Sequence, residues 1–241
     1  MIHRFIFAYP RPGMTEAEFR RYRVDVHAVR YASKIPQARR YLVDTRIALP
    51  EKNGEPLWCS VDEFWFENEK ELIESLQSTE FLQGAYLDEP NCTALWRTVT
   101  LDTTTHTIHE APEDTHDNSM AKLLVLSKRK EGLPLDRFRT YCLDTHAAKV
   151  MKLPGLRRYR QGHVRDGAYA VAEATLDCVE QLWFDSVDTA LAAQSWVHQD
   201  MVRADYRLFT EERYIHTMLV REHWIIGPQP RPYDRQSTVS V

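Results

Sequence analysis

This sequence lacks the short motifs that would identify a familiar reaction. No GxGxxG, Walker, HExxH or GxSxG pattern is present, so dinucleotide binding, nucleotide hydrolysis, zinc-dependent proteolysis and serine hydrolysis have no sequence signal. The four cysteines, Cys59, Cys92, Cys142 and Cys178, are widely spaced and include no CxxC pair. We therefore expect reduced thiols rather than a disulfide framework, and we expect no cofactor.

Strong charge of one sign and long apolar runs are also lacking. The formal net charge is −4 and the pI is near 6.2, and no basic stripe interleaved with aromatics is present, which argues against nucleic-acid binding. No apolar run approaches the roughly 20 residues that a membrane-spanning helix needs. The N-terminus enters a strand-like pattern at once, so we expect no signal peptide, no membrane partner and a cytoplasmic protein.

What the sequence does contain is the same pattern twice. The period is about 118 residues, far longer than that of a solenoid or propeller repeat, so each copy is a whole domain. The 241 residues, 43% hydrophobic and 27% charged, have room for two globular domains. The residues that recur in the same order are Gly13/Gly132, Phe19/Phe138, Arg20/Arg139, Tyr22/Tyr141, Asp25/Asp144, His27/His146 and Ala28/Ala147.

The expected elements have the same order in both copies. Each copy begins with a short strand, turns at a glycine and enters a helix, which begins in the first copy with a capping-box pattern at Thr15 and Glu18. Two strands, a shorter helix and a last strand follow. The expected strands are 3–9, 39–47, 58–66 and 95–101, then 122–128, 156–164, 179–185 and 214–220, and the expected helices are 16–33, 70–77, 135–152 and 188–196.

This βαββαβ order predicts an α+β fold in which a four-stranded antiparallel sheet has both helices on one face. The other face would stay apolar, and two such sheets packed face to face would bury it, so we interpret the duplication as a dimer tethered within one chain. We place the first domain at residues 1–104 and the second at 120–226. A polar linker at 105–119 joins them, and the proline-rich tail at 227–241 is predicted to be an extended arm or disordered.

Two histidines are the main candidates for chemistry. At about 100° per residue, His27 and His146 fall at one edge of the packed helix face, and Asp25 and Asp144 fall at the other, so the two residue types cannot pair directly. A partly desolvated imidazole, near-neutral at physiological pH, suits general acid/base work on a ligand between helix and sheet. A buried imidazole bonded to a main-chain carbonyl is the structural alternative. The aspartates are predicted to be structural, each bonded to an arginine or a cap.

Aromatic residues and one arginine complete the predicted site. Tyr41 and Tyr159 begin the second strand of each copy, where a phenol can donate to a carbonyl or enolate oxygen, although filling the gap between sheet and helix is the more common role. Trp65 and Trp183 are core residues of the third strand that could also wall an aromatic pocket. The predicted catalytic set is His146, His27, Tyr159 and Tyr41, and the predicted substrate-binding set is Tyr141, Tyr22, Trp183, Trp65 and Arg23.

The two halves are not chemically equal, and the linker adds no metal site. Arg23 corresponds to Cys142, and Glu63 to Gln181, so one pocket can work while the other has lapsed. The linker contains histidines and a carboxylate that could suggest a metal site. We discount this site, because a flexible polar linker provides no scaffold that fixes the coordination geometry. The linker residues concerned are His106, His109, Glu110 and His116.

The repeated phrases resemble the EthD family. The resemblance lies in Phe138-Arg139-Thr140-Tyr141 with Asp144-Thr145-His146-Ala147, in the stretch from Lys152 to Tyr159, and in Leu182-Trp183-Phe184-Asp185-Ser186, while the first copy is a more diverged match. It implies a dimeric α+β barrel of ferredoxin-like units, in agreement with the element order. The family includes methylmuconolactone isomerases, in which a histidine and a tyrosine matching His146 and Tyr159 line the pocket beside a cysteine just before the Trp-Phe pair. This chain has Leu182 and Phe64 at that cysteine position.

The leading hypothesis is a cofactor-independent isomerase, lyase, dehydratase or cyclase of small-molecule catabolism or secondary metabolism. It would act on a small apolar cyclic, aromatic or lactone-like metabolite, with a histidine moving a proton while a tyrosine stabilises oxygen. One alternative is a non-catalytic barrel that binds a small molecule or supports another enzyme, and another is haem binding through one of the histidines. A small hydrophobic metabolite is the expected partner, and a homodimer of the tandem chain is a further expectation.

Overall fold

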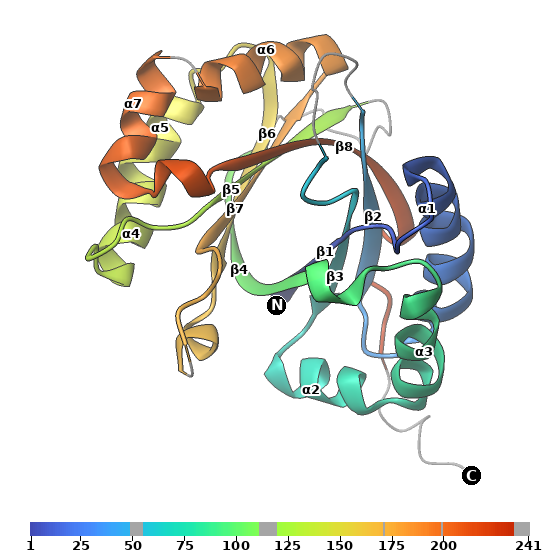
Figure 1. The fold of residues 1–241 in the computed structure, drawn as a ribbon. Coiled ribbons are helices and arrows are strands. Elements are labelled where there is room, and N and C mark those ends of the chain that lie inside the picture. The colour runs from blue at the N-terminus through green and yellow to red at the C-terminus, as the bar shows by residue number, and fades with distance from the viewer. Residues whose placement is uncertain (49–54, 111–119, 171, 199, 234–241) are drawn as a thin grey trace. The chain divides into compact units, whose positions relative to one another are not determined.

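The chain passes twice through a similar run of strands and helices (Figure 1). This computed structural model describes residues 1–48, 55–110, 120–170, 172–198 and 200–233, and none of the helices in these ranges is both long and apolar enough to cross a membrane. The first run contains β1 (Ile2–Ala8), α1 (Glu16–Tyr22), η1 (Arg23–Tyr31), η2 (Ala32–Lys34), β2 (Arg40–Arg46), β3 (Ser60–Phe66), α2 (Glu69–Gln77), η3 (Glu80–Ala85), α3 (Tyr86–Asp88), η4 (Glu89–Asn91), η5 (Leu95–Arg97) and β4 (Val99–Glu110). The second contains β5 (Ala121–Ser127), α4 (Leu135–Tyr141), η6 (Cys142–His146), α5 (Ala147–Val150), β6 (Leu156–Val164), η7 (Asp166–Tyr169), β7 (Cys178–Phe184), α6 (Val187–His198), α7 (Asp200–Phe209), η8 (Glu212–Tyr214) and β8 (His216–Ile226).

The fold is a mixed α/β fold. Within the described ranges the strands follow the order β1-β3-β2-β8-β5-β7-β6-β4 in a closed barrel. Antiparallel ladders join β3 to β1 and β2 in the first run. In the second run β5 pairs with β8 and β7, and β7 pairs with β6, so β5 and β7 are the central strands of that sheet.

The chain divides into two compact units. Unit 1 comprises Met1–Leu101 with Glu222–Val241, and unit 2 comprises Asp102–Arg221. The last strand of each run is therefore shared, because β4 contributes its residues from Asp102 onward to unit 2, while β8 contributes those from Glu222 onward to unit 1. In each unit taken by itself the helices lie on one side of the strands (Figure 1).

Strand β4 is longer than the sequence patterns indicate. We expected a strand at 95–101 and a linker from residue 105, but η5 occupies Leu95–Arg97 and β4 continues to Glu110. Its threonines and Ile108 are β-branched, and its residues from Thr103 onward pair with β6, so a polar segment that suggested a linker is a strand with exposed side chains. The remaining part of the predicted linker, residues 111–119, lies outside the described residues.

The first long helix of each run changes its hydrogen-bonding pattern at the same place. Helix α1 begins with the predicted capping box, in which Thr15 and Glu18 each accept a hydrogen bond from the other's main-chain N–H. From Arg23 to Tyr31 the pattern is that of a π-helix, as it is in η6 of the second run. Turns of this kind are rare in proteins as a whole, but those that occur are often found at functional sites. Each of these two segments carries one of the candidate histidines.

Strand alternation decides which side chains can face the helices. Tyr41 lies opposite Phe64 in the β2–β3 ladder, and both belong to the core cluster that includes helix residues. Successive side chains of a strand point to opposite faces of the sheet, so Trp65 lies on the other face. The register of β6 with β7 separates Tyr159 from Trp183 in the same way.

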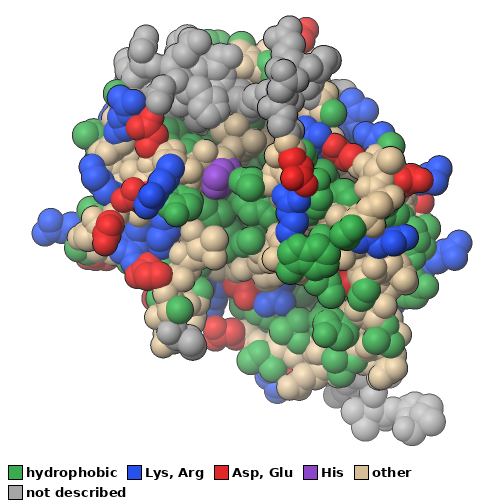
Figure 2. Space-filling model, viewed as in Figure 1, with side chains coloured by type: hydrophobic (Ala, Val, Ile, Leu, Met, Phe, Trp, Pro, Cys, Tyr) green, Lys and Arg blue, Asp and Glu red, His purple; other side chains and the backbone are tan. Residues whose placement is uncertain are grey.

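Helices α2 and α3 of unit 1 leave part of their apolar side chains exposed. Leu72 and Ala85 join the core of the unit, whereas other large apolar side chains gather on the surface over α2, η3 and α3 (Figure 2). The exposed ones are Ile73, Leu76, Leu82, Tyr86 and Leu87.

The described part of the tail lies along unit 1. The Arg231 guanidinium donates to the main-chain carbonyls of Ala38 at 2.8 Å and Ser33 at 2.9 Å, and also to that of Ile35. Residues 227–233 therefore form an arm, one of the two predicted outcomes, while residues 234–241 lie outside the described ranges.

Candidate functional site

His146 is buried between two carboxylates. It is the last residue of η6 and has no exposed surface. Its Nδ1 lies 2.7 Å from a carboxylate oxygen of Asp205 on α7, and its Nε2 lies 3.2 Å from a carboxylate oxygen of Glu180 on β7. Both ring nitrogens therefore face acidic side chains, and not the main-chain carbonyl of the structural alternative.

Glu180 is the centre of this cluster. The Tyr159 hydroxyl donates to its Oε2, and the Tyr206 hydroxyl donates to its Oε1 at 2.7 Å. Together with His146, donors from β6, α7 and η6 converge on one buried carboxylate. Two phenols and an imidazolium are a donor set that can also stabilise the oxygen of an enolate, a phenolate or a substrate carboxylate.

Asp205 connects His146 to the edge of the cluster. It accepts a hydrogen bond from the Tyr141 hydroxyl at 2.6 Å and an ion-pair contact from the partly exposed Lys149 ammonium. Tyr141, predicted to bind substrate, is therefore bonded to the carboxylate that orients the candidate catalytic histidine.

The carboxylates determine the charge of the histidine. Burial alone favours the neutral ring, but the Glu180 charge and the hydrogen bonds to Asp205 and Glu180 outweigh it and raise the pKa of His146 to about 10. Despite burial, the same contacts lower the pKa of Asp205 to about 2 and hold the pKa of Glu180 below its usual value. Burial and the Glu180 charge raise the pKa of Tyr159 and Tyr206 well above their usual value. His146 is thus an imidazolium at neutral pH and not the near-neutral ring that we expected.

A row of polar side chains continues from this cluster along β6. Tyr159, Gln161 and His163 alternate along the strand and point to one face. The Gln161 amide nitrogen donates to the Tyr159 hydroxyl oxygen at 2.6 Å, and the Gln161 amide oxygen lies 2.9 Å from His163 Nε2. Burial and the neighbouring His106 lower the pKa of His163 to about 4. Two histidines of one network therefore hold opposite protonation states at neutral pH, which is typical of acid/base sites.

Unit 1 holds the corresponding histidine among different charges. His27 is buried, with Nδ1 2.9 Å from Asp88 and Nε2 3.3 Å from Glu89. The buried Arg23 guanidinium donates to Glu89 at 2.7 Å and to Asp62 at 2.6 and 2.8 Å. The arginine predicted to bind substrate is thus paired with two carboxylates of its own chain.

The hydroxyls of the predicted tyrosines of unit 1 also donate hydrogen bonds to carboxylates. Tyr41 donates to Asp62 at 2.6 Å, and Tyr22 donates to Asp88 at 2.8 Å. Burial, followed by the Asp62 charge, raises the pKa of Tyr41 well above its usual value, so this phenol stays protonated. Both hydroxyls are therefore part of the His27 cluster.

The predicted tryptophans lie away from both clusters. Trp65 and Trp183 are buried, as expected for core residues, but they occupy the sheet face opposite to the histidines. Trp65 stacks on Trp224 at a centroid distance of 5.8 Å, and the Arg158 guanidinium lies 5.0 Å from the Trp183 ring centroid. The period of two along a strand separates them from the tyrosines, so they cannot wall the same cavity as His27 or His146.

Other predicted residues also have different surroundings. Asp25 and Asp144, expected to be held by an arginine or a cap, are exposed. His106 and His109 lie on β4, and His116 lies outside the described residues. Across the described ranges, no three His, Cys, Asp or Glu side chains are arranged to hold a metal ion.

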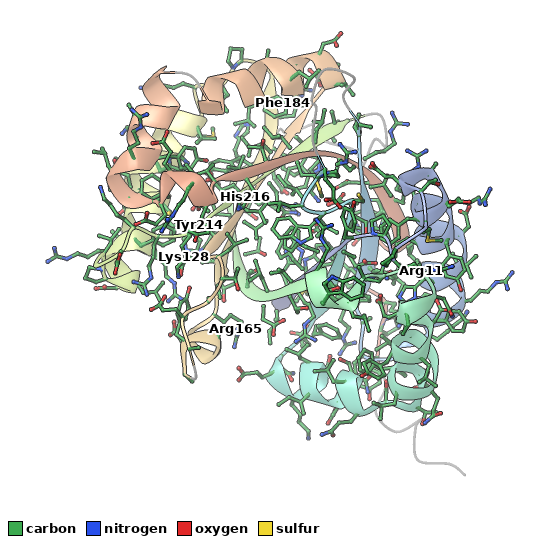
Figure 3. The ribbon with its side chains drawn as sticks, viewed as in Figure 1. Arg11, Lys128, Arg165, Phe184, Tyr214 and His216 are labelled. Carbon is green, nitrogen blue, oxygen red and sulfur yellow. The ribbon has the colours of Figure 1, made fainter. Side chains whose placement is uncertain are left out.

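Two surface pockets lie near the turns that follow β1 and β5. One of about 460 Å³ is lined by residues that include Arg11 and Tyr22, and one of about 300 Å³ is lined by residues that include Lys128 and Tyr214 (Figure 3). Neither lining includes His27 or His146. The two histidine clusters are therefore part of the interior between helices and sheet in each unit.

Sequence reasoning misses the carboxylates that hold the histidines. Asp62 and Glu180 occupy equivalent positions of the two third strands, and Asp88 and Asp205 are likewise about one repeat period apart. A carboxylate that recurs inside an apolar strand at the repeat period indicates a buried partner, because unpaired acidic side chains are almost never fully buried. That signal could have identified Asp62 and Glu180. It could not have identified His163, whose equivalent in the first copy is a threonine.

Comparison with known proteins supports the fold and shows a family similarity within the second half of the chain. No curated protein matches the chain. Among solved structures, an anthrone oxidase-like protein has a TM-score of 0.61 at 12% identity, covering 94% of this chain and 93% of its own. A proposed monooxygenase from Fusobacterium nucleatum subsp. nucleatum ATCC 25586 has a TM-score of 0.56 at 5% identity, covering 97% of each chain. Another from Lactobacillus acidophilus NCFM has a TM-score of 0.51 at 9% identity, covering 92% of this chain and 93% of its own.

Identities this low establish similarity of fold and not of reaction. The model of the EthD domain matches residues 130–212. These residues include His146, Tyr159, Glu180 and Asp205, which form the core of the unit 2 cluster. The similarity to the EthD domain therefore covers the part of the chain that holds the unit 2 cluster.

Proposed function

We propose that unit 2 is the working half of an enzyme that transforms a small cyclic, aromatic or lactone-like metabolite by proton transfer. The observation that carries the proposal is the convergence of His146, Tyr159 and Tyr206 on one buried carboxylate within the EthD domain. Such a donor set can protonate a substrate oxygen, or hold it while negative charge develops there. The reaction class is isomerisation, dehydration, cyclisation or elimination.

The protonation states assign a role to each residue. His146 is cationic and acts first as the acid, while Asp205 at Nδ1 orients the ring so that Nε2 faces the reacting oxygen. Tyr159 and Tyr206 stay protonated and donate hydrogen bonds. Glu180 accepts from all of them, so a substrate oxygen would compete with this carboxylate for its donors.

Unit 1 has a structural role in this proposal. Its cluster holds Asp62 and Glu89 with the Arg23 guanidinium, which keeps its charge at every physiological pH and transfers no proton. His27 is therefore the lapsed counterpart of His146.

For the fold, we propose that the two runs are tandem ferredoxin-like βαββαβ domains related as an intramolecular dimer. The strand order β8-β5-β7-β6 of the second run and the sequence repeat support this interpretation. We keep the domains of this proposal at residues 1–104 and 120–226, with β4 of the first run continuing to Glu110.

Haem ligation through the predicted histidines does not fit their surroundings. Both ring nitrogens of His27 and of His146 lie 2.7 to 3.3 Å from carboxylate oxygens, so axial ligation would break a buried ion pair. A barrel that binds a small molecule without reaction is the second candidate, because the same donors can hold a ligand oxygen.

Exchange of carbon-bound hydrogen tests the enzyme proposal without knowledge of the product. The purified protein is incubated in heavy water with cyclic ketones, lactones and phenols, and the loss of C–H signals is followed by proton NMR. We expect exchange above the buffer rate with at least one of these classes. We expect His146→Gln and Tyr159→Phe each to slow it by about 100-fold, because each removes a positioned donor.

The repeat supplies matched controls for this experiment. Tyr41→Phe makes the same change in unit 1, and we expect it to leave the exchange rate unchanged. Thermal melts of each variant separate a lost site from a lost fold. Equal losses in Tyr41→Phe and Tyr159→Phe would contradict the assignment to unit 2. Binding of a panel member without exchange would replace the enzyme by the binding protein.

A further inference from the structure

His163 has a buried ring nitrogen that the cluster leaves unsatisfied. The residue is 2% exposed, and its Nδ1 makes no hydrogen bond to any of the described residues. A buried polar atom without a partner costs about 1–3 kcal/mol. Such atoms are rare in native proteins, and a functional role is one of the few explanations for them.

The hydrogen bonds of Gln161 determine which nitrogen of His163 carries the proton. The main-chain carbonyl of Cys142 can only accept, so the Gln161 amide nitrogen must face it, and the two atoms are 2.9 Å apart. The amide oxygen of Gln161 therefore faces His163 Nε2, also at 2.9 Å, and this acceptor requires an N–H. In the neutral ring Nδ1 is then the nitrogen with the lone pair, which can accept a hydrogen bond and cannot donate one.

Unit 1 shows that the fold does not require this lone pair. The positions on β2 that correspond to Gln161 and His163 are Val43 and Thr45. The Thr45 hydroxyl has a partner, because it lies 2.9 Å from Nε2 of His223. The polar row that begins at the proposed catalytic tyrosine therefore exists in unit 2 and has no equivalent in unit 1.

The ring of His163 lies near two other rings, and its pKa is lowered by burial, by His106 and by the nearby Arg139 charge. Its ring centroid lies 4.9 Å from that of the partly exposed His106 and 6.5 Å from that of Phe138, which itself packs on Phe209 at 5.8 Å. An acceptor on a ring that lies among other flat rings favours a planar ligand that carries a single donor group.

We propose that His163 Nδ1 accepts a hydrogen bond from a hydroxyl or N–H group of the substrate and so selects ring compounds that carry such a donor. The inference rests on the proposed function, because it places the same substrate along β6. His163 is four positions after Tyr159, or about 13 Å along the strand at ~3.3 Å per residue, which a fused-ring skeleton with a polar group at each end can span. A phenol on such a skeleton is the favoured donor.

Paired probes that differ in one donor test this inference. Naphthol and its methyl ether have nearly the same shape, but the ether has no O–H. We expect wild-type protein to bind naphthol at least about tenfold more tightly, the effect of leaving a buried acceptor unpaired. In nitrogen NMR of isotopically labelled histidine, the Nδ1 signal of His163 should move with naphthol and stay with the ether.

Two substitutions separate the role of Nε2 as a donor from the role of Nδ1 as an acceptor. His163→Gln keeps a side-chain amide near the Nε2 position and removes the acceptor at Nδ1, so we expect discrimination between the two probes to disappear. His163→Asn places an amide oxygen near Nδ1 and should retain part of the discrimination. Thr45→Val, the matched change in unit 1, should leave it unchanged, and thermal melts confirm that each variant folds.

The outcomes are distinct from those of the exchange experiment. No binding of naphthol, equal affinity for both probes, or full discrimination in His163→Gln would each overturn the role of His163. An Nδ1 signal that does not move when naphthol is bound would do the same and would indicate water as its partner. Failure of the proposed function instead appears as absence of carbon exchange, which the binding measurement does not require.

Discussion

The two units place a histidine among buried carboxylates at equivalent positions but balance the charges differently. In unit 1 the Arg23 guanidinium compensates Asp62 and Glu89. At the repeat-equivalent positions of Arg23 and Glu89, unit 2 has Cys142 and Tyr206. One cation and one anion are therefore exchanged together for neutral groups. This pairing is expected, because removal of either partner alone would leave a buried charge uncompensated.

The difference also changes what each cluster can do. A guanidinium keeps its positive charge next to its carboxylates at every physiological pH, since it does not lose its proton in a protein. In unit 2 the donors to Glu180 are two phenols and an imidazolium, and in the proposed function these groups donate to a substrate oxygen in place of Glu180 or transfer a proton. The proposed function therefore assigns acid/base chemistry to the half that has no arginine at this position.

The largest expected effect is that of Arg23→Met. Removing the guanidinium leaves Asp62 and Glu89 without their cation, so we expect the free energy of unfolding in urea to fall by about 3–5 kcal/mol. Arg21→Met, at an exposed position of the same helix, should change it by less than about 0.5 kcal/mol. A loss of similar size in both variants would show that the buried pairing is not what stabilises unit 1.

Opposite pH dependences are expected from the two histidines of unit 2. The pKa of His163 is lowered from 6.5 to about 4 in the folded state, so its contribution to stability is present above pH 6.5 and is lost as the pH falls toward 4. The pKa of His146 is raised from 6.5 to about 10, so its contribution is present below pH 6.5 and is lost as the pH rises toward 10. Urea unfolding across pH should show His163→Phe gaining about 1–3 kcal/mol relative to wild type at the acid end. A constant difference between the two proteins from pH 7 to pH 4 would contradict this assignment.

A double-mutant cycle tests whether the charge exchange between the units is coupled. Arg23→Cys and Glu89→Tyr together convert two positions of unit 1 to their unit 2 equivalents. We expect the double variant to be more stable than the sum of the single changes by about 0.5–3 kcal/mol, because each substitution removes the charge that the other leaves unpaired. Additive effects would mean that the two positions changed independently.

The smallest expected effect concerns the starts of the two long helices. Helix α1 has the Thr15–Glu18 capping box, whereas α4 begins after Pro134 with no side-chain cap. We expect Thr15→Ala to lower the free energy of unfolding by about 1 kcal/mol. Thr140→Ala, at an exposed position within α4, should change it by less than about 0.5 kcal/mol. Equal effects would show that the capping box adds no stability to α1.

Much of the fold follows from local patterns in the sequence. The capping box of α1 and the alternation of strands are confirmed, because each depends on residues close together in the chain. The extension of β4 to Glu110 is missed, because polar β-branched residues become a strand only when β6 supplies the partner. The tryptophans are correctly predicted to be buried, but their face depends on the register of the ladder.

The sequence by itself determined the duplication, the order of elements and the placing of one histidine on the first long helix of each half, since these are properties of spacing along the chain. Only the tertiary structure decided which side chains those histidines contact and which charge they carry. Glu180 and Asp205 lie 34 and 59 positions from His146, and their carboxylates set its charge. Gln161 lies on β6, and its amide is oriented by the main-chain carbonyl of Cys142 on η6. The oriented amide oxygen then decides which nitrogen of His163 carries a lone pair. Protonation depends on distance in space, through burial and the nearest charges, and spacing along the sequence does not report it.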